Sequence, residues 1–191
     1  ILINNAGIGS GNLNDHQRKF SQDGYELRLA VNYLAPFLLT NLLLPNLKQS
    51  SSARIINVSS VGQDPIDLSN IMLEQNYSPF HAYKCSKLAL TAFTFLLAKK
   101  CADYPITVNC LHPGSLLNTK MVRESKILPL GRVKTGADAI LHLTLSPKLE
   151  KVTGEYFDKK TKATANYQAY DEKFQLDLWG LSEKLTKFHE I

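Results

Sequence analysis

The sequence of 191 residues is 44% apolar and 20% charged, a balance that is ordinary for a globular protein and excludes a disordered or fibrous chain. Its length predicts one domain. The net charge of +5 is spread along the chain apart from one lysine cluster at residues 159–162, so a small solvated patch is favoured over a nucleic-acid site.

The first half of the chain alternates apolar runs with a long periodic segment. Residues 1–3 are apolar and predict a short strand, and residues 25–47 carry apolar stripes that predict a helix despite Pro36 and Pro45. Residues 54–60, RIINVSS, are rich in β-branched side chains and predict a second strand.

The second half continues the alternation. Residues 82–101 predict a helix, and residues 106–114 predict a strand that ends at Pro-Gly. Residues 135–146 predict a helix that begins at a threonine cap. Residues 154–160 are consistent with an edge strand, and residues 167–188 with a terminal helix.

This order of elements predicts the α/β class. Strands that are apolar throughout and separated by helices indicate a parallel sheet covered on both faces, which is a Rossmann-like, doubly wound, three-layer α/β/α fold. Because no internal repeat or low-complexity linker interrupts the pattern, residues 1–191 are expected to form a single domain.

The opening stretch, ILINNAGIGSGN, looks like a strand feeding a glycine-rich turn of the kind that binds dinucleotides. Gly7 and Gly9 match the first two glycines of GxGxxG, but the third position is Asn12. Glu26 lies near the distance expected for a ribose-binding acid. On its own, the stretch is a degraded fingerprint.

A second candidate is Tyr83 with Lys87, four residues apart on one face of the helix over residues 82–101. A tyrosine is a poor acid–base group near neutral pH, and a neighbouring ammonium stabilises its phenolate. A serine from the preceding strand could hold a substrate oxygen beside the phenol. Alone, such a pair is more often a surface contact.

Five motifs occur in order: NNAG at residues 4–7, Asn32 in VNYLAPFLLT, INVSS ending at Ser60, YKCSK at residues 83–87, and NCLHPG at residues 109–114. Together they resemble the short-chain dehydrogenase/reductase superfamily, and VNYLAPFLLT, LHPG and LWGLSEKLT are most similar to its retinol-dehydrogenase-like members. The likeness runs nearly end to end. It places NNAG after the fourth strand of the family fold rather than the first.

The resemblance implies a catalytic set. Tyr83 would donate and accept the proton, Lys87 would lower the pKa of Tyr83 and bind the nicotinamide ribose, and Ser60 would polarise the substrate oxygen. Asn32 would hold a water in a proton relay. Ser60 is preferred to Ser59 because it precedes a Val-Gly step. Taken singly, each residue also fits an ordinary structural role.

The resemblance implies NAD or NADP as the cofactor, with Tyr83 and Lys87 also contacting it. Further residues would line its adenosine and carboxamide ends. They are Asn5, Ala6 and Gly7 on the adenosine side, and Pro113, Gly114, Leu116 and Thr119 on the carboxamide side.

The implied reaction interconverts an alcohol and a carbonyl on a small to medium hydrophobic substrate by nicotinamide hydride transfer. Residues 63–80, inserted between the serine and the tyrosine, are expected to border the substrate pocket. Residues 115–133 are expected to form a mobile lid. Its apolar side chains suggest a hydrophobic substrate: Leu116, Leu117, Met121, Val122, Ile127 and Leu128.

The family's glycine-rich phosphate turn and the residue that selects NAD or NADP lie in a first half that this sequence does not contain. We therefore expect the C-terminal two-thirds of the family fold, with an exposed apolar edge at residues 1–3. The alternative is a truncated, non-catalytic member that acts through protein contacts or is inactive alone.

Other classes find little support. The sequence has no GxSxG, no GxxxxGK[ST], no HExxH and no CxxC, so neither a serine hydrolase, a P-loop NTPase nor a metal site is indicated. Three unrelated cysteines suggest free thiols in a reducing compartment, here taken as the cytoplasm. FLLTNLLL is expected to be too short to cross a membrane. The resemblance leaves a homodimer or homotetramer open.

Overall fold

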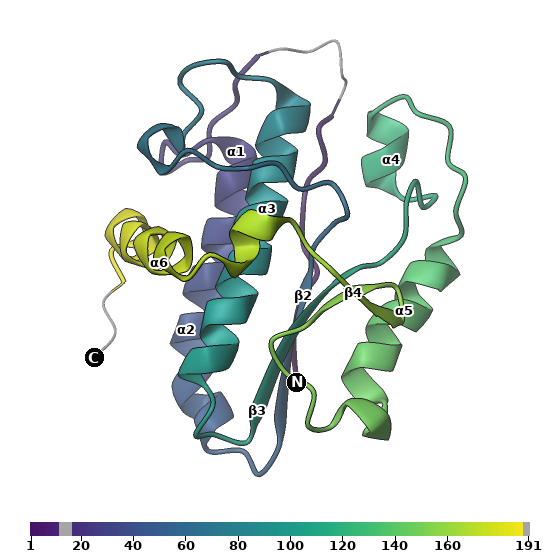
Figure 1. The fold of residues 1–191 in the computed structure, drawn as a ribbon. Coiled ribbons are helices and arrows are strands. Elements are labelled where there is room, and N and C mark those ends of the chain that lie inside the picture. The colour runs from purple at the N-terminus through teal and green to yellow at the C-terminus, as the bar shows by residue number, and fades with distance from the viewer. Residues whose placement is uncertain (12–16, 189–191) are drawn as a thin grey trace.

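A five-stranded sheet organises the computed structural model, which describes residues 1–11 and 17–188. In spatial order the strands are β1 (Leu2–Asn4), β2 (Ala53–Val58), β3 (Ile106–His112), β4 (Tyr156–Asp158) and β5 (Thr161–Ala163). The first four run parallel, and β5 runs antiparallel to β4. The predicted α/β class with a mostly parallel sheet is confirmed (Figure 1).

The predicted edge strand at residues 154–160 is a strand, but its edge position is wrong. β4 lies between β3 and β5, and Tyr156 of β4 pairs with Ala163 of β5. The chain reverses at Lys159, whose φ of 55° places it in the left-handed region used in tight turns. Among the described residues, β5 is therefore the outer strand on that side.

Helices cover both faces of the sheet (Figure 1). One face carries α1 (Leu27–Leu29), the π-helical turn η1 (Ala30–Leu34), α2 (Ala35–Lys48), α3 (Pro79–Lys100) and α6 (Glu172–Thr186). The other face carries α5 (Val133–Leu145), and the short α4 (Lys120–Glu124) precedes it. Single 3₁₀ turns occupy Leu68–Asn70, Pro147–Leu149 and Tyr167–Tyr170.

Two apolar cores lie against the sheet, one on each face. Under α2, α3 and α6, the rings of Phe37, Phe93 and Trp179 pack with centroids 5.1 to 5.7 Å apart. Under α5, Leu143 packs with Leu111 of β3. β2 and β3 are buried on both faces, so their burial does not alternate along the sequence. The polar Asn57 and Asn109 within them are hydrogen-bonded, to Thr94 and to the Val152 carbonyl.

The helix predicted over residues 25–47 is confirmed, with an unexpected widening at its start. Pro36 has no N–H to donate to the preceding turn. The backbone before it is wound as a π-helix, in which the Ala35 N–H donates to the Ala30 carbonyl. Such π turns occur frequently at functional sites, and this one contains Asn32.

Two helix starts differ from the prediction. Thr135 is not a cap: α5 begins before it, and the Thr135 N–H donates to the Arg132 carbonyl inside the first turn. The terminal segment at residues 167–188 is divided, because the Asp171 carboxylate accepts the Phe174 N–H and starts α6 there.

The helical run Leu27–Lys48 is long and apolar enough to cross a membrane by length and composition alone. The argument from FLLTNLLL therefore fails on length, because the helix extends well beyond that stretch. However, 56% of the tested window is buried inside the protein, and core helices of globular proteins pass the same test. The run is weak evidence for a membrane span.

The β1 edge exposes apolar side chains, as expected. Ile1 is 66% and Ile3 39% exposed, and within the described ranges β1 pairs on one side only, with β2. An open edge of this kind is a template for pairing with another strand.

Candidate active site

The predicted catalytic residues meet where β1 and β2 end beside the first turns of α3. Ser60 follows β2, Asn32 lies in η1, and Tyr83 and Lys87 project from α3. A Cβ added to Gly7, after β1, would lie 3.2 Å from Asn32 Oδ1 and 3.5 Å from Lys87 Nζ. Segments far apart in the sequence thus converge on one point.

Lys87 is a buried cation beside the tyrosine. Its Nζ donates to the Val58 carbonyl at 2.8 Å and lies 5.9 Å from the centroid of the Tyr83 ring. Burial lowers the pKa of Lys87 to about 8, because a charged amine is costly to remove from water. Lys87 therefore loses its proton at a lower pH than an exposed lysine does.

Tyr83 shows the opposite effect to the one expected from its neighbour. Burial raises the pKa of the Tyr83 phenol above its usual value, and a hydrogen bond with the Ser60 side chain offsets part of that rise. The predicted lowering by Lys87 does not dominate in this structure. At neutral pH the phenol holds its proton, as a proton donor must.

The structure separates the two serines at the end of β2. Ser59 Oγ donates to the Lys87 carbonyl at 3.1 Å and pairs with Thr91 Oγ1 at 2.7 Å, so it fastens β2 to α3. Ser60 Oγ accepts the Gly62 N–H at 3.0 Å, so its own hydroxyl hydrogen can serve the hydrogen bond with the Tyr83 side chain. This geometry supports Ser60 as the residue that faces the tyrosine.

Asn32 ties the loop after β1 to α3. Its Oδ1 accepts the Ile8 N–H at 2.8 Å, and its Nδ2 donates to the Ile8 carbonyl at 3.0 Å and to Ser86 Oγ at 2.9 Å. Ser86 Oγ in turn donates to the Tyr83 carbonyl at 2.7 Å. Asn32 is fully buried, so these bonds hold the loop and the tyrosine turn in register.

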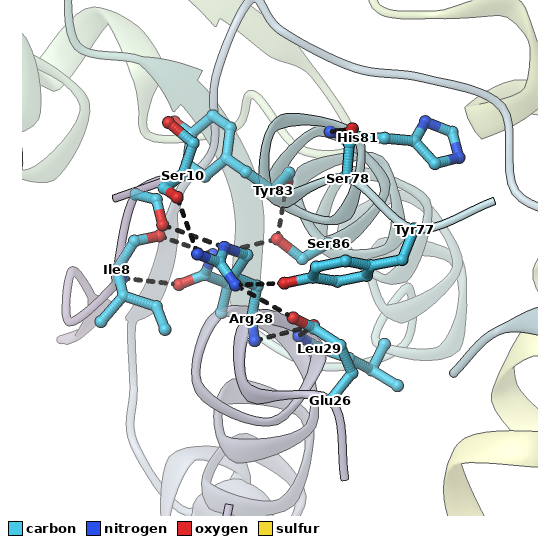
Figure 2. Close-up of polar contacts among 12 residues, drawn as sticks. Ile8, Ser10, Glu26, Arg28, Leu29, Tyr77, Ser78, His81, Tyr83 and Ser86 are labelled. Carbon is cyan, nitrogen blue, oxygen red and sulfur yellow. Dashed lines mark hydrogen bonds and ion pairs between the residues drawn. The ribbon is translucent and has the colours of Figure 1, made fainter. Parts of the chain in front are cut away.

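Arg28 is a site-building residue that the sequence reasoning missed (Figure 2). Its guanidinium donates to the Gly9 carbonyl at 3.1 Å, to the Ser10 carbonyl at 2.7 Å and to the Tyr77 hydroxyl at 2.8 Å. It also pairs with Glu26 at 3.2 Å, both side chains being buried. An arginine among the apolar stripes of this helix was the available signal.

Glu26, noted for its distance from the glycine turn, is an N-cap instead. Its Oε2 accepts the Arg28 and Leu29 N–H groups, each at 2.8 Å. These bonds satisfy orphan donors at the start of α1. The carboxylate is therefore already committed to the helix start and to Arg28.

Replacing Arg28 with methionine is expected to lower the free energy of unfolding by about 3 to 5 kcal/mol, because it leaves the buried Glu26 carboxylate without its partner. Tyr77→Phe, which removes only a hydroxyl, should cost about 1 kcal/mol. Urea unfolding measures both. If the Arg28→Met protein had the same free energy of unfolding as Tyr77→Phe, Arg28 would not be the partner that stabilises the buried Glu26.

The predicted cofactor-lining residues lie at two strand ends. Asn5 and Ala6 are exposed immediately after β1. The residues that follow β3 are half-buried: Pro113, Gly114, Leu116 and Thr119. Gly114 has φ 131° and Leu116 φ 48°, so the chain turns sharply here. A non-glycine residue in the left-handed region is costly and such positions cluster at functional sites.

The lid segment is pinned at its base. A Cβ on Gly131 or Gly136 would lie 2.8 or 2.6 Å from the Leu117 side chain, so both glycines make room for it. Farther along, Met121 of α4 lies against the loop after β1, where a Cβ on Gly9 would come within 2.7 Å of its Cγ. The lid thus touches the loop that borders the site.

The inserted segment at residues 63–80 borders a cavity, and its predicted place beside the substrate pocket stays a prediction. The cavity has a volume of about 210 Å³, and its lining includes Glu26, His81, Cys85 and Ser86. Neither the tyrosine nor the serine of the candidate site lines it. Burial raises the pKa of the Cys85 thiol to about 12, so this thiol is not activated.

Sequence comparison finds one family across most of the chain. The family described as short chain dehydrogenase matches residues 1–127. Human retinol dehydrogenase 12 is 38% identical over 196 residues, and human retinol dehydrogenase 14 is 37% identical over 203. Each alignment covers 97% of this chain but only 60% and 58% of those proteins. The chain thus spans about 60% of the length of these curated relatives.

Solved structures agree with the sequence match. An uncharacterized protein from Mycobacterium Paratuberculosis superposes with a TM-score of 0.76 and 29% identity, covering 97% of this chain and 66% of that one. A 4-hydroxyisoleucine dehydrogenase complexed with NADH gives 0.59 and 25%, covering 82% and 65%. An NADPH-bound carbonyl reductase from chicken fatty liver gives 0.60 and 29%, covering 86% and 64%.

Proposed function

Because this chain belongs to the short-chain dehydrogenase family, we propose that it carries the catalytic and substrate-binding part of an NAD(P)-dependent oxidoreductase that interconverts an alcohol and a carbonyl. The observation that supports this most is the convergence of Tyr83, Lys87, Ser60 and Asn32 from α3, β2 and η1. The proposed activity is that of the whole protein, because this chain spans only about 60% of the length of its curated relatives.

The residues have complementary roles in this proposal. Tyr83, protonated at neutral pH, gives its proton to the carbonyl oxygen in reduction and takes it back in oxidation. Ser60, whose side chain hydrogen-bonds with Tyr83, would donate its hydroxyl hydrogen to the same substrate oxygen and orient it. The Lys87 ammonium favours the tyrosinate that remains after proton transfer.

The residues present fit a nicotinamide nucleotide at its ribose and carboxamide. The resemblance assigns Gly7 to the adenosine side, but a Cβ on Gly7 would lie 3.5 Å from Lys87 Nζ. We therefore propose that Gly7 borders the nicotinamide ribose and that the Lys87 ammonium donates a hydrogen bond to a ribose hydroxyl there. The sharp turn at Gly114, directly after β3, would let backbone approach the carboxamide closely. When bound, the nicotinamide would supply or accept the hydride. NADH and NADPH complexes are both known among similar structures.

The substrate we propose is a small to medium hydrophobic alcohol or its carbonyl. The half-buried apolar side chains of the lid, Leu117, Met121 and Val122, support this class. So does the similarity to retinol dehydrogenases. The lid would close over the substrate and exclude water from the reacting atoms.

The proposal also includes the oligomeric state of the protein and its compartment. The exposed Leu39 and Leu42 of α2 would allow association into a homodimer or homotetramer, which size-exclusion chromatography would detect. The free thiols of Cys85, Cys101 and Cys110 are consistent with a reducing compartment such as the cytoplasm.

Nucleotide binding tests whether this chain acts as part of an enzyme. Titration with NADPH and NADH, followed by nucleotide fluorescence, is expected to saturate. Gly7→Val should weaken binding at least about tenfold, because its methyl groups would occupy the space beside Lys87. Gly180→Val is the matched control, since a Cβ there meets nothing within 4 Å.

The competing function is a non-catalytic family member that acts through protein contacts. It is kept as an alternative because the chain spans only about 60% of the length of its curated relatives. Absence of saturable binding to either nucleotide would support this alternative for the chain while leaving its family membership intact. Binding that Gly7→Val and Gly180→Val affect equally would contradict the proposed ribose site.

A further inference from the structure

The segment that joins α4 to α5 exposes large apolar side chains. Leu128 and Leu130 are each 77% exposed, Val133 is 51% and Ile127 38%. Single exposed leucines are normal, but several exposed apolar side chains within seven consecutive residues, 127–133, are more typical of an interaction site. Ile127 and Leu128 are among the lid side chains from which a hydrophobic substrate was predicted, and their exposure leaves that substrate class a prediction.

The same segment is strongly basic. Residues 120–134 carry five cationic side chains and one anionic side chain. Lys120 pairs with Glu124 and Lys134 with Asp138. Lys126 and Arg132 are exposed and bracket the apolar residues in sequence. We call residues 126–133 the lid tip.

The lid tip is held at the outside of the molecule. The Leu130 N–H donates to the Leu116 carbonyl and the Asn118 N–H to the Gly131 carbonyl, at 3.0 and 2.9 Å. These bonds close the base of the segment, and its connection to α5 runs along one outer side of the fold, away from α2 and α6 (Figure 1). The exposed leucines therefore belong to a segment whose base is held by backbone hydrogen bonds.

We propose that the lid tip docks on the surface of an anionic lipid bilayer. Leucines bracketed by cations match the boundary between acyl chains and acidic headgroups, where apolar burial and charge attraction act together. A second copy of the chain fits less well, because two lid tips would bring like charges together. An anionic bilayer is therefore the partner that matches both the apolar and the cationic side chains of the lid tip.

Docking has a consequence for the candidate site. Met121, in the same lid, contacts the loop after β1 at Gly9. On the proposed function, a docked lid tip would hold the entrance of the site at the bilayer, where hydrophobic alcohols partition. The docking itself requires no nucleotide and no turnover.

Vesicle flotation of the 191-residue chain tests the proposal. We expect the chain to float with phosphatidylcholine vesicles containing phosphatidylserine, and much less with phosphatidylcholine alone. Leu128→Ser/Leu130→Ser should reduce binding at least about tenfold, through lost apolar burial. Lys126→Glu/Arg132→Glu should reduce it by about fivefold or more for each residue changed.

Matched variants control for non-specific binding by exposed leucines and for the change in net charge. Leu141→Ser/Leu145→Ser removes two leucines of α5 that are 51% and 62% exposed, and Lys148→Glu/Lys151→Glu makes the same charge change outside the lid tip. Both should float like the parent. Fluorescence of the buried Trp179 checks that every variant is folded.

Three results would overturn the proposal: flotation that does not depend on phosphatidylserine, control variants that lose binding as much as the lid-tip variants, or a lid-tip-dependent dimer that does not float. Flotation measures membrane binding and does not depend on nucleotide. Loss of nucleotide binding would therefore count against the proposed function and not against membrane docking.

Discussion

Replacing Tyr83 with phenylalanine is expected to lower turnover of the complete enzyme at least about a thousandfold, the scale of a lost general acid–base group. The substitution removes one oxygen from a half-buried ring and keeps the ring's packing. Nucleotide affinity should stay within about twofold, because Lys87 and Gly7 remain in place. Steady-state kinetics and nucleotide titration of the same preparation separate the two effects.

Tyr104→Phe serves as the control for Tyr83→Phe. Tyr104 is an exposed tyrosine near the end of α3, so its hydroxyl should be dispensable for turnover. Substantial turnover by Tyr83→Phe would refute the acid–base role. A parallel loss of nucleotide affinity would instead show that the Tyr83 hydroxyl mainly supports binding.

Replacing Lys87 with methionine is expected to weaken both turnover and nucleotide binding, each at least about tenfold, because one ammonium serves the tyrosinate and the ribose. The methionine keeps most of the buried volume, so the loss reports the charge rather than a cavity. A Lys87→Met enzyme with normal kinetics would reject the assignment.

The same variant has a pH signature. The pKa of Lys87 in the folded chain is about 8, below that of an exposed lysine, so burying the charged form destabilises the fold. This penalty is fully present below about pH 8 and fades as pH rises toward the unfolded pKa. Lys87→Met should therefore raise the free energy of unfolding at pH 7, by up to about 3 kcal/mol, with a smaller gain at pH 9 to 10.

Urea unfolding at pH 7 and pH 9.5 measures this trade-off between stability and activity. Lys84→Met is a suitable control, because Lys84 lies on the same helix but is partly exposed and pairs with Asp64 at 3.3 Å. A Lys87→Met gain that is independent of pH would show that hydrophobic packing, not the buried charge, is responsible.

Most elements could be predicted because their signals are local. The strand at residues 54–60 is β-branched, and the helix over residues 82–101 has apolar residues on nearly all sides, so each specifies its structure and burial within a short window. Errors arose where the pairing of backbone groups, rather than the residue type, decides. β4 is not an edge strand because the chain turns back and pairs β5 with it, and Thr135 is not a cap because its N–H already donates to the Arg132 carbonyl inside α5's first turn.

The sequence by itself determined the chemistry and order of the site: a serine after one strand, and a tyrosine and a lysine four apart on the next helix. These follow from residue type and helical period, which require no knowledge of the rest of the chain. Together with the resemblance, they identified the family that the comparisons show.

Only the tertiary structure decided which side chains are available. Ser59 is occupied by Thr91 whereas Ser60 faces the tyrosine, and Arg28 is buried as a clamp rather than exposed as a charge. It also turned Leu128 outward. Burial and hydrogen-bond partners come from segments distant in the chain, and they control pKa and exposure, so neither can be obtained from local pattern alone.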